Sequence, residues 1–225
     1  ALAVACLGFA ASFGVPHRPA AMHDARKFPW TGPVDTVRTV VQCFRDRVLG
    51  LVIVADMFVW FAGSMEILVI NVLGKEQLGY SGSATSGMLV AELGGIAAGG
   101  LLAGKVATGP LWHRVLGLVA TAAAVLPEPV RYYCVLLGLI AAGVSGGLFM
   151  IPCESFVQIR PAADRRGEVI SATNFMVFIG IMASAPLANA LNEHIRPSAS
   201  FALLGGLCLL AAGALRLTLG REKEA

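Results

Sequence analysis

Long apolar runs separated by short polar segments dominate the chain. A transmembrane helix needs about 20 predominantly apolar residues, and six runs come close to that length. They are residues 48–73, 84–104, 111–127, 132–153, 169–191 and 200–219. A shorter apolar stretch, residues 1–14, precedes them and is expected to be the end of a further transmembrane helix. The pattern predicts an all-α membrane protein.

The composition agrees with this pattern. Mean hydropathy is +0.74, and hydrophobic residues make up 56 % of the chain. Charged residues make up 14 %, against about 25 % in soluble domains. The apolar runs are continuous rather than short segments of alternating polarity, which argues against an outer-membrane barrel. Transmembrane helices are the other structure that can span a membrane, because a helix satisfies all of its backbone hydrogen bonds within one segment.

Basic residues are distributed unevenly between the polar segments. When these segments are assigned alternately to two sides of a membrane, 14 of the 17 Lys and Arg residues fall on one side. The other side holds only Lys75, Arg131 and Arg196. Because basic residues near the ends of transmembrane helices stay in the cytoplasm, we expect residues 15–47 and the C-terminus to be cytoplasmic. The basic residues are dispersed among loops, so no nucleic-acid partner is expected.

The order of segments predicts four regions. They are residues 1–14, the end of a helix; 15–47, a cytoplasmic linker; 48–220, a six-helix bundle; and 221–225, a cytoplasmic tail. Within the linker, residues 34–44 carry apolar side chains at helical spacing. This spacing predicts a short amphipathic helix, either on the membrane surface or packed on the bundle as an ordinary linker helix. Because the chain starts at Ala1 without a Met, we expect a fragment or the product of a truncated gene.

Four polar residues lie inside the first two long runs. They are Asp56, Glu66, Asn71 and Glu92. An ionisable group inside a membrane costs about 2.5–3.5 kcal/mol on insertion scales, so it needs a partner or a wet cavity. The three carboxylates therefore predict a transport pathway, by contact with a substrate or by relay of a proton. The alternative interpretation is a structural hydrogen bond between helices.

A polar cluster surrounds the end of the run at 132–153. It consists of Glu154, Gln158, Arg165, Arg166 and Asn174. Pro152 removes a backbone donor and is expected to kink the helix just before this cluster. The cluster predicts a cytoplasmic gate or a site for a zwitterionic or anionic headgroup, since Arg suits phosphate. The alternative is anchoring of the helix ends by basic residues, together with an Arg–Glu pair.

Three G-x-x-x-G pairs lie in the long runs. They are Gly95–Gly99, Gly100–Gly104 and Gly143–Gly147. Such spacing lets two helix backbones approach closely, so these glycines predict internal helix packing. A face on which helices slide or rock is a compatible interpretation.

No pattern typical of an enzyme is present. The chain lacks G-x-S-x-G, P-loop and H-E-x-x-H motifs. The four histidines are scattered, and the five cysteines show neither metal spacing nor a C-x-x-C motif. We therefore expect no enzymatic activity, no cofactor and no metal site.

The layout resembles the C-terminal half of a major facilitator transporter, in which two six-helix halves are joined by a long cytoplasmic linker. Gly100 to Lys105 resembles the short G-x-L-x-D-R loop motif of that superfamily, with Gly104 in place of the acidic residue. The stretch from Gly143 to Asn174 is similar to the bacterial lysophospholipid transporters. Members of that branch move lysophospholipids inward across the inner membrane, and some are fused to an acyltransferase and an acyl-activating enzyme.

These resemblances imply a multi-pass protein of the bacterial inner membrane that moves its substrate by alternating access. Its partners would be membrane lipids, a lysophospholipid or small amphipathic substrate, and a missing N-terminal six-helix half. One rival keeps the fold and predicts a proton-coupled drug or metabolite transporter. Another predicts the membrane part of a fused phospholipid acyltransferase.

Overall fold

The computed structural model describes residues 2–14, 31–103 and 130–221. Every regular element in these ranges is a helix. The chain divides into two compact units, residues 1–33 and 34–225. The first unit contains α1 (Leu2–Ser12), which matches the apolar stretch expected at residues 1–14. The second unit contains the long helices and is described on its own below.

Five of the described helices are long and apolar enough to cross a membrane. They are α3 (Arg47–Val72) with its continuation η1 (Leu73–Gln77), α4 (Gly82–Ala103), α6 (Val130–Ile159), α7 (Arg166–His194) and α8 (Pro197–Arg221). They confirm five of the six expected runs and the all-α membrane fold. The run expected at residues 111–127 lies outside the described residues.

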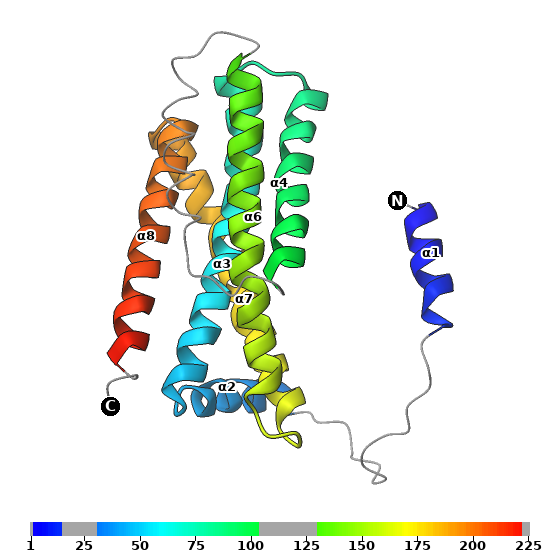
Figure 1. Cartoon of the computed structure of the whole chain (residues 1–225), viewed down its shortest axis with the longest axis vertical. Helices are drawn as coiled ribbons and strands as arrows, with labels where there is room; N and C mark the ends of the chain where they lie inside the picture. Colours follow the sequence, from blue (N-terminus) through cyan, green and yellow to red (C-terminus); the bar gives the residue numbers. More distant parts are fainter. Residues whose placement is uncertain (1, 15–30, 104–129, 222–225) are drawn as a thin grey trace. The chain divides into compact units, whose positions relative to one another are not determined.

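The shorter helix α2 (Gly32–Cys43) confirms the helix expected in the second half of the linker. It lies across one end of the bundle rather than along it (Figure 1). The apolar side chains of Val34, Val37, Val41 and Phe44 are exposed. The buried Cys43 packs instead with Leu49 of α3 and its neighbours.

Local sequence explains where α3 and α4 begin. Asp46 caps α3, because its carboxylate accepts hydrogen bonds from the backbone N–H groups of Val48 (3.1 Å) and Leu49 (3.2 Å). Between η1 and α4 the chain turns at Gly79, whose φ of +67° is a conformation that glycine adopts without strain. Ser81 then accepts a hydrogen bond from the Ala84 N–H at the start of α4.

Helix α6 is longer than the sequence pattern predicts. It continues through Pro152 to Ile159, past the end of the apolar run at residue 153. Proline removes one backbone donor, yet the residues on either side keep the helical path. Glu154 and Gln158 therefore lie one turn apart in the last turns of α6.

Glycines set the contact between α4 and α6. A Cβ atom at Gly95 or Gly99 would overlap the backbone carbonyl oxygens of Ile140 and Val144. In return, Gly143 and Gly147 lie against the backbone of α4. The order of these contacts shows that α4 and α6 run parallel. Two of the three predicted G-x-x-x-G pairs thus meet each other, whereas Gly104 of the third lies outside the described residues.

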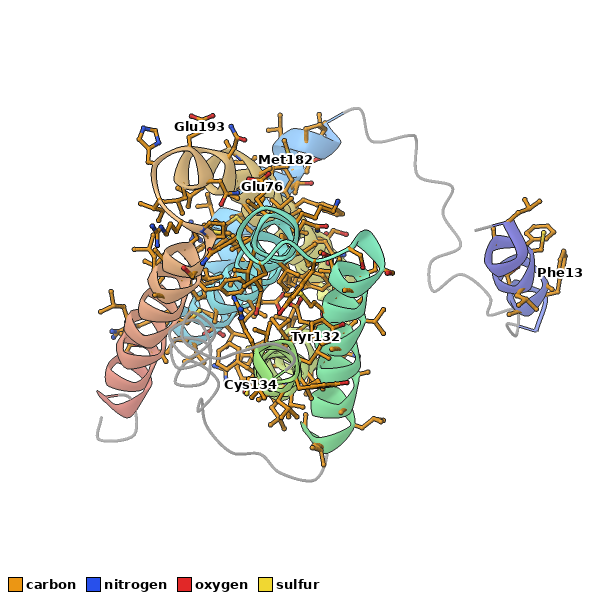
Figure 2. The ribbon with its side chains drawn as sticks, turned by 90° about the horizontal axis from the view of Figure 1, so that it is seen from above. Phe13, Glu76, Tyr132, Cys134, Met182 and Glu193 are labelled. Carbon is orange, nitrogen blue, oxygen red and sulfur yellow. The ribbon has the colours of Figure 1, made fainter. Side chains whose placement is uncertain are left out.

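Helices α3 and α7 also run parallel, with Gly180 of α7 packed against Met57 and Phe61 of α3. Figure 1 shows that α3 and α7 ascend while α4, α6 and α8 descend. The N-terminus of α3, the turn between α6 and α7, and the C-terminus of α8 therefore share one end of the bundle. The opposite end, seen from above in Figure 2, carries Glu76, Tyr132 and Glu193.

Two hydrophobic cores hold this unit together. The larger core contains Met65, Val69 and Ile70 of α3 with residues of α4, α6, α7 and α8. The smaller core, near the α2 end, joins Ile53, Val157 and partners on α7. On α3, α6 and α7 there is a stretch between the positions that enter the two cores. The candidate site includes Asp56 and Trp60 from this stretch of α3, and on α6 and α7 it overlaps the smaller core.

Candidate functional site

A cavity of about 520 Å³, here called the polar cavity, opens between α3, α6 and α7. Its walls come from α3 and from the consecutive helices α6 and α7. Its lining includes Asp56, Trp60, Glu154, Gln158, Thr173 and Asn174. Four of the residues that the sequence singles out, namely Asp56, Glu154, Gln158 and Asn174, thus line one cavity.

Asp56 is the most buried acidic group of the polar cavity. Its side chain is only 2 % exposed, and its Oδ1 atom has no hydrogen-bond partner. The charge of Glu154 on α6 interacts electrostatically with Asp56. Two negative groups in one poorly solvated cavity repel each other, and a positively charged ligand between them would remove that repulsion.

The amide side chains of Gln158 and Asn174 are exposed and lie on α6 and α7. Gln158 follows Glu154 by one helical turn, so both face the cavity. An amide offers both donors and an acceptor. This part of the cavity can therefore bind an oxygen-rich polar group without placing a second charge there.

The remaining wall of the polar cavity is apolar and aromatic. Trp60 is 38 % exposed, and Val177, Phe178 and Ile181 line the cavity from α7. An aromatic face attracts an ammonium group, and aliphatic side chains favour a hydrocarbon chain. The polar cavity therefore suits an amphipathic molecule with a cationic end.

Glu66 and Glu92 lie in a second cavity of about 230 Å³, here called the carboxyl cavity. The two side chains are hydrogen-bonded to each other across α3 and α4. Apart from these two groups the lining is mostly apolar or glycine, including Leu93, Ile96 and Gly143. Trp60 lines both cavities.

Asn71 is not among the residues that line the polar cavity or the carboxyl cavity. Its side-chain amide donates to the backbone carbonyl of Ile67, one turn earlier in α3. No contact joins it to Glu66 or Glu92 among the described hydrogen bonds. Its proposed place in the pathway stays a prediction.

Arg165 and Arg166 lie at the start of α7 and are not among the residues that line the polar cavity. Arg165 donates to the Gln42 side chain of α2 at 2.5 Å and lies 3.7 Å from Glu168. The structure therefore places this Arg in contact with the linker helix, and the predicted contact with a headgroup stays a prediction. An Arg–Glu pair, the alternative interpretation of the cluster, is present.

A second contact joins the same segments. The Arg160 guanidinium lies 3.1 Å from the Asp46 carboxylate and over the Phe156 ring. Partial burial acts to raise the pKa of Asp46, but hydrogen bonds from the Leu49 N–H and from Arg160 outweigh it and lower this pKa below its usual value. Burial raises the pKa of the neighbouring Cys43 thiol. Asp46 therefore stays ionised and joins the start of α3 to the end of α6.

Sequence reasoning missed the α7 wall of the polar cavity. Ile170, Thr173, Val177 and Ile181 recur at intervals of three and four residues, which is the spacing of one helix face. This stripe was visible in the sequence, but an apolar stripe equally fits an ordinary core or a lipid contact. The one residue next to this stripe that the sequence analysis had selected as a candidate was the polar Asn174.

The described residues hold no group of three or more His, Cys, Asp or Glu side chains that could bind a metal ion. The acidic residues of the two cavities occur in pairs, Asp56 with Glu154 and Glu66 with Glu92. A pair of carboxylates suits a proton or an organic cation.

Comparison with known protein families identifies the family to which this helical bundle belongs. The family model of the Major Facilitator Superfamily matches residues 1–185. The chain belongs to the major facilitator superfamily. No curated protein and no solved structure matches it.

As a major facilitator protein, the chain is a multi-pass membrane transporter and not an enzyme. The match covers α3, α4 and α6 and most of α7, and therefore includes every residue that lines the two acidic cavities. The match is to the superfamily as a whole and leaves the substrate open.

Proposed function

We propose that this major facilitator transporter carries an amphipathic molecule with a positively charged amine, and that the polar cavity binds the amine. The observation that carries the proposal is the placement of Asp56 and Glu154 in one cavity beside Trp60. A buried carboxylate with an unpartnered oxygen, such as Asp56, is costly in a membrane. A cationic group on the substrate removes that cost, and a molecule without such a group does not.

A lysophospholipid with an ethanolamine headgroup is the substrate that we propose. Its ammonium would lie between Asp56 and Glu154, and the amide groups of Gln158 and Asn174 would donate to its phosphate. Its acyl chain would lie along the apolar α7 wall. Support comes from the amphipathic lining of the cavity and from the similarity of residues 143–174 to lysophospholipid transporters.

Transport would proceed by alternating access, in which two halves rock around a site between them. The exposed lining residues of the polar cavity would meet a second six-helix half. We further propose that the protein lies in a bacterial inner membrane with its C-terminus in the cytoplasm. The charge bias between polar segments supports this orientation.

Uptake into proteoliposomes tests the substrate. We expect uptake of lysophosphatidylethanolamine, and a loss of about tenfold or more on Asp56→Asn or Glu154→Gln, since a buried charge pair contributes several kcal/mol. Lysophosphatidylglycerol, which has no amine, should be a poor substrate for the unmodified protein. The matched control is Glu76→Gln, because Glu76 is exposed and lies outside both cavities.

Two results would contradict the proposal. The first is equal uptake of the amine-containing and amine-free lipids. The second is full uptake after both carboxylates of the polar cavity have been neutralised.

A small organic cation is the second candidate substrate. The observation in its favour is the Glu66–Glu92 pair, which adds a site for proton coupling beside the polar cavity. Competition separates the two candidates. A quaternary amine without an acyl chain should inhibit lipid uptake weakly if the lipid is the substrate, and strongly if the small cation is.

A further inference from the structure

The linker helix α2 carries an exposed apolar face. Val34, Val37, Val41 and Phe44 follow one another at intervals of three and four residues, so they lie on one side of the helix. Their side chains are 46–69 % exposed. Cys43 is the residue of α2 that is buried, so the helix contacts the bundle near its C-terminus and leaves the apolar face uncovered.

A tight turn fixes α2 next to the start of α3. Only three residues, 44–46, separate the two helices. Gly50 of α3 packs so closely against Phe44 that a Cβ atom on Gly50 would lie 3.2 Å from the Phe44 Cα atom. Because α3 is long and apolar enough to cross a membrane and α2 lies across its end (Figure 1), we expect α2 at the level of the lipid headgroups.

Two arginines accompany this apolar face. Arg38 and Arg45 are exposed, and no described ion pair includes either of them. Asp35 is the acidic residue of α2, and Asp46, after the helix, is already paired with Arg160. Exposed apolar side chains beside unpaired arginines are typical of a helix that binds an anionic membrane surface.

We propose that α2 and the turn that follows it form a binding surface for anionic phospholipids, and that bound lipid steadies the start of α7 through Gln42. The apolar side chains of α2 would lie among the acyl chains. The guanidinium groups of Arg38 and Arg45 would contact the phosphate oxygens of the headgroups. A negatively charged lipid surface therefore holds α2 more firmly than a neutral one, whatever substrate the protein carries.

Gln42 and Arg165 connect this surface to the polar cavity. The Arg165 guanidinium donates to the side-chain oxygen of Gln42. The Arg165 backbone N–H donates to the Ala162 carbonyl oxygen (3.0 Å) inside the turn between α6 and α7. Helix α7 begins at the next residue and carries Thr173 and Asn174 into the wall of the polar cavity. When lipid fixes α2, the contact with Arg165 persists and the turn opens less often.

Hydrogen–deuterium exchange of the unmodified protein is the first test, because it needs no variant. The protein is compared in nanodiscs of phosphatidylcholine alone and of an equal mixture of phosphatidylcholine and phosphatidylglycerol. We expect the backbone amides of residues 37–43 and 162–166 to exchange several-fold more slowly in the mixture. High salt should reduce this difference, because it screens exposed charges. Equal exchange in the two lipids would overturn the proposal.

Removal of the two positive charges is the second test. In Arg38→Gln combined with Arg45→Gln, the effect of phosphatidylglycerol on exchange should disappear. The matched control is Lys75→Gln combined with Arg196→Gln, which removes the same charge from exposed residues at the opposite end of the bundle. The control should keep the full lipid effect. An effect that survives in the α2 variant, or that is lost equally in the control, would overturn the proposal.

Spin labels on α2 test which phase the apolar face occupies. In a background without the native cysteines, a label on Val41→Cys should be reached more readily by dissolved oxygen, which enters the bilayer, than by a water-soluble nickel complex. A label on the exposed Asp35→Cys should show the reverse.

Three outcomes of this labelling would overturn the proposal. Access of the nickel complex to both labels alike would place the apolar face in water. Protection of the Val41→Cys label from both reagents would show that protein covers this face. Equal insertion with and without phosphatidylglycerol would show that the bound lipid need not be anionic.

Discussion

Gly99 of α4 lies against the backbone of Val144 in α6, so closely that a methyl group on Gly99 would overlap the Val144 carbonyl oxygen. Backbone atoms cannot move aside as a side chain can. The two helices would have to separate, and that separation would widen the carboxyl cavity, which Glu92 and Gly143 line from the same pair of helices.

Gly99→Ala is therefore expected to lower the free energy of unfolding by about 1–3 kcal/mol, the usual cost of overpacking. Gly94→Ala, on the same helix, should have little effect, because no atom lies within 4 Å of a Cβ atom placed at Gly94. Thermal unfolding in detergent compares the two variants. Equal melting temperatures would show that the α4–α6 contact is looser than described.

Asp46→Asn is expected to destabilise the start of α3. The carboxylate caps the helix and contacts Arg160, and loss of a cap costs about 0.5–2 kcal/mol. Because the pKa of Asp46 is lowered on folding, its contribution is complete above the unfolded value of about 3.8 and disappears as pH falls through the folded value.

Melting temperatures measured from neutral to acidic pH test the direction of this pH dependence. The unmodified protein should melt at a higher temperature than Asp46→Asn at neutral pH, and the difference between the two melting temperatures should disappear below about pH 4. A difference that increases as the pH falls would contradict the assignment.

Gln42→Ala is expected to expose the turn between α6 and α7 to protease. Arg165 loses its partner on α2 in this variant, and a hydrogen bond to a charged group contributes about 1.5–3 kcal/mol. Limited trypsin digestion should therefore cut after Arg165 or Arg166 several-fold faster than in the unmodified protein. An unchanged rate would indicate that the α2 contact does not hold this turn.

Cysteine labelling tests which side chains face the polar cavity. In a background without the native cysteines, Asn174→Cys should react with a hydrophilic thiol reagent, because Asn174 is exposed and lines the cavity. Ser184→Cys on the same helix should be inert, since Ser184 is only 2 % exposed. The amine-containing lipid should protect Asn174→Cys, and labelling that the lipid leaves unchanged would argue against this binding site.

Much of the fold follows from short-range pattern. Continuous apolar runs predict the long helices, and the paired glycines at 95, 99, 143 and 147 predict close backbone contact. What spacing alone does not reveal is which pairs meet. The contact of Gly99 with Val144 depends on the relative register of α4 and α6, which no local rule determines.

In the candidate site too, the sequence predicts the individual residues but not which of them lie together. Asp56, Glu66 and Glu92 stand out in the sequence because an ionisable residue inside an apolar run is rare and costly. Which cavity each residue lines depends on contacts between helices. Asp56 of α3 interacts with Glu154 of α6, whereas Glu66 of α3 interacts with Glu92 of α4.

The Arg pair illustrates why closeness in sequence misleads. Arg166 precedes Asn174 by eight residues, and a helix rises about 1.5 Å per residue, so the two lie more than two turns apart along α7. Arg165 also contacts Gln42, which comes from the linker. A headgroup contact for these arginines was reasonable from the sequence, but the lining of the polar cavity does not include them.

Fluorescence of Trp60 offers the most direct test of the central claim, that the polar cavity binds an amphipathic molecule through its positively charged amine. In a protein that retains Trp60 while Trp30 and Trp112 are replaced by Phe, titration with lysophosphatidylethanolamine should give a saturable change in emission. That change should be absent for lysophosphatidylglycerol and lost in Asp56→Asn. An equal response to both lipids, or a response that survives Asp56→Asn together with Glu154→Gln, would contradict the account.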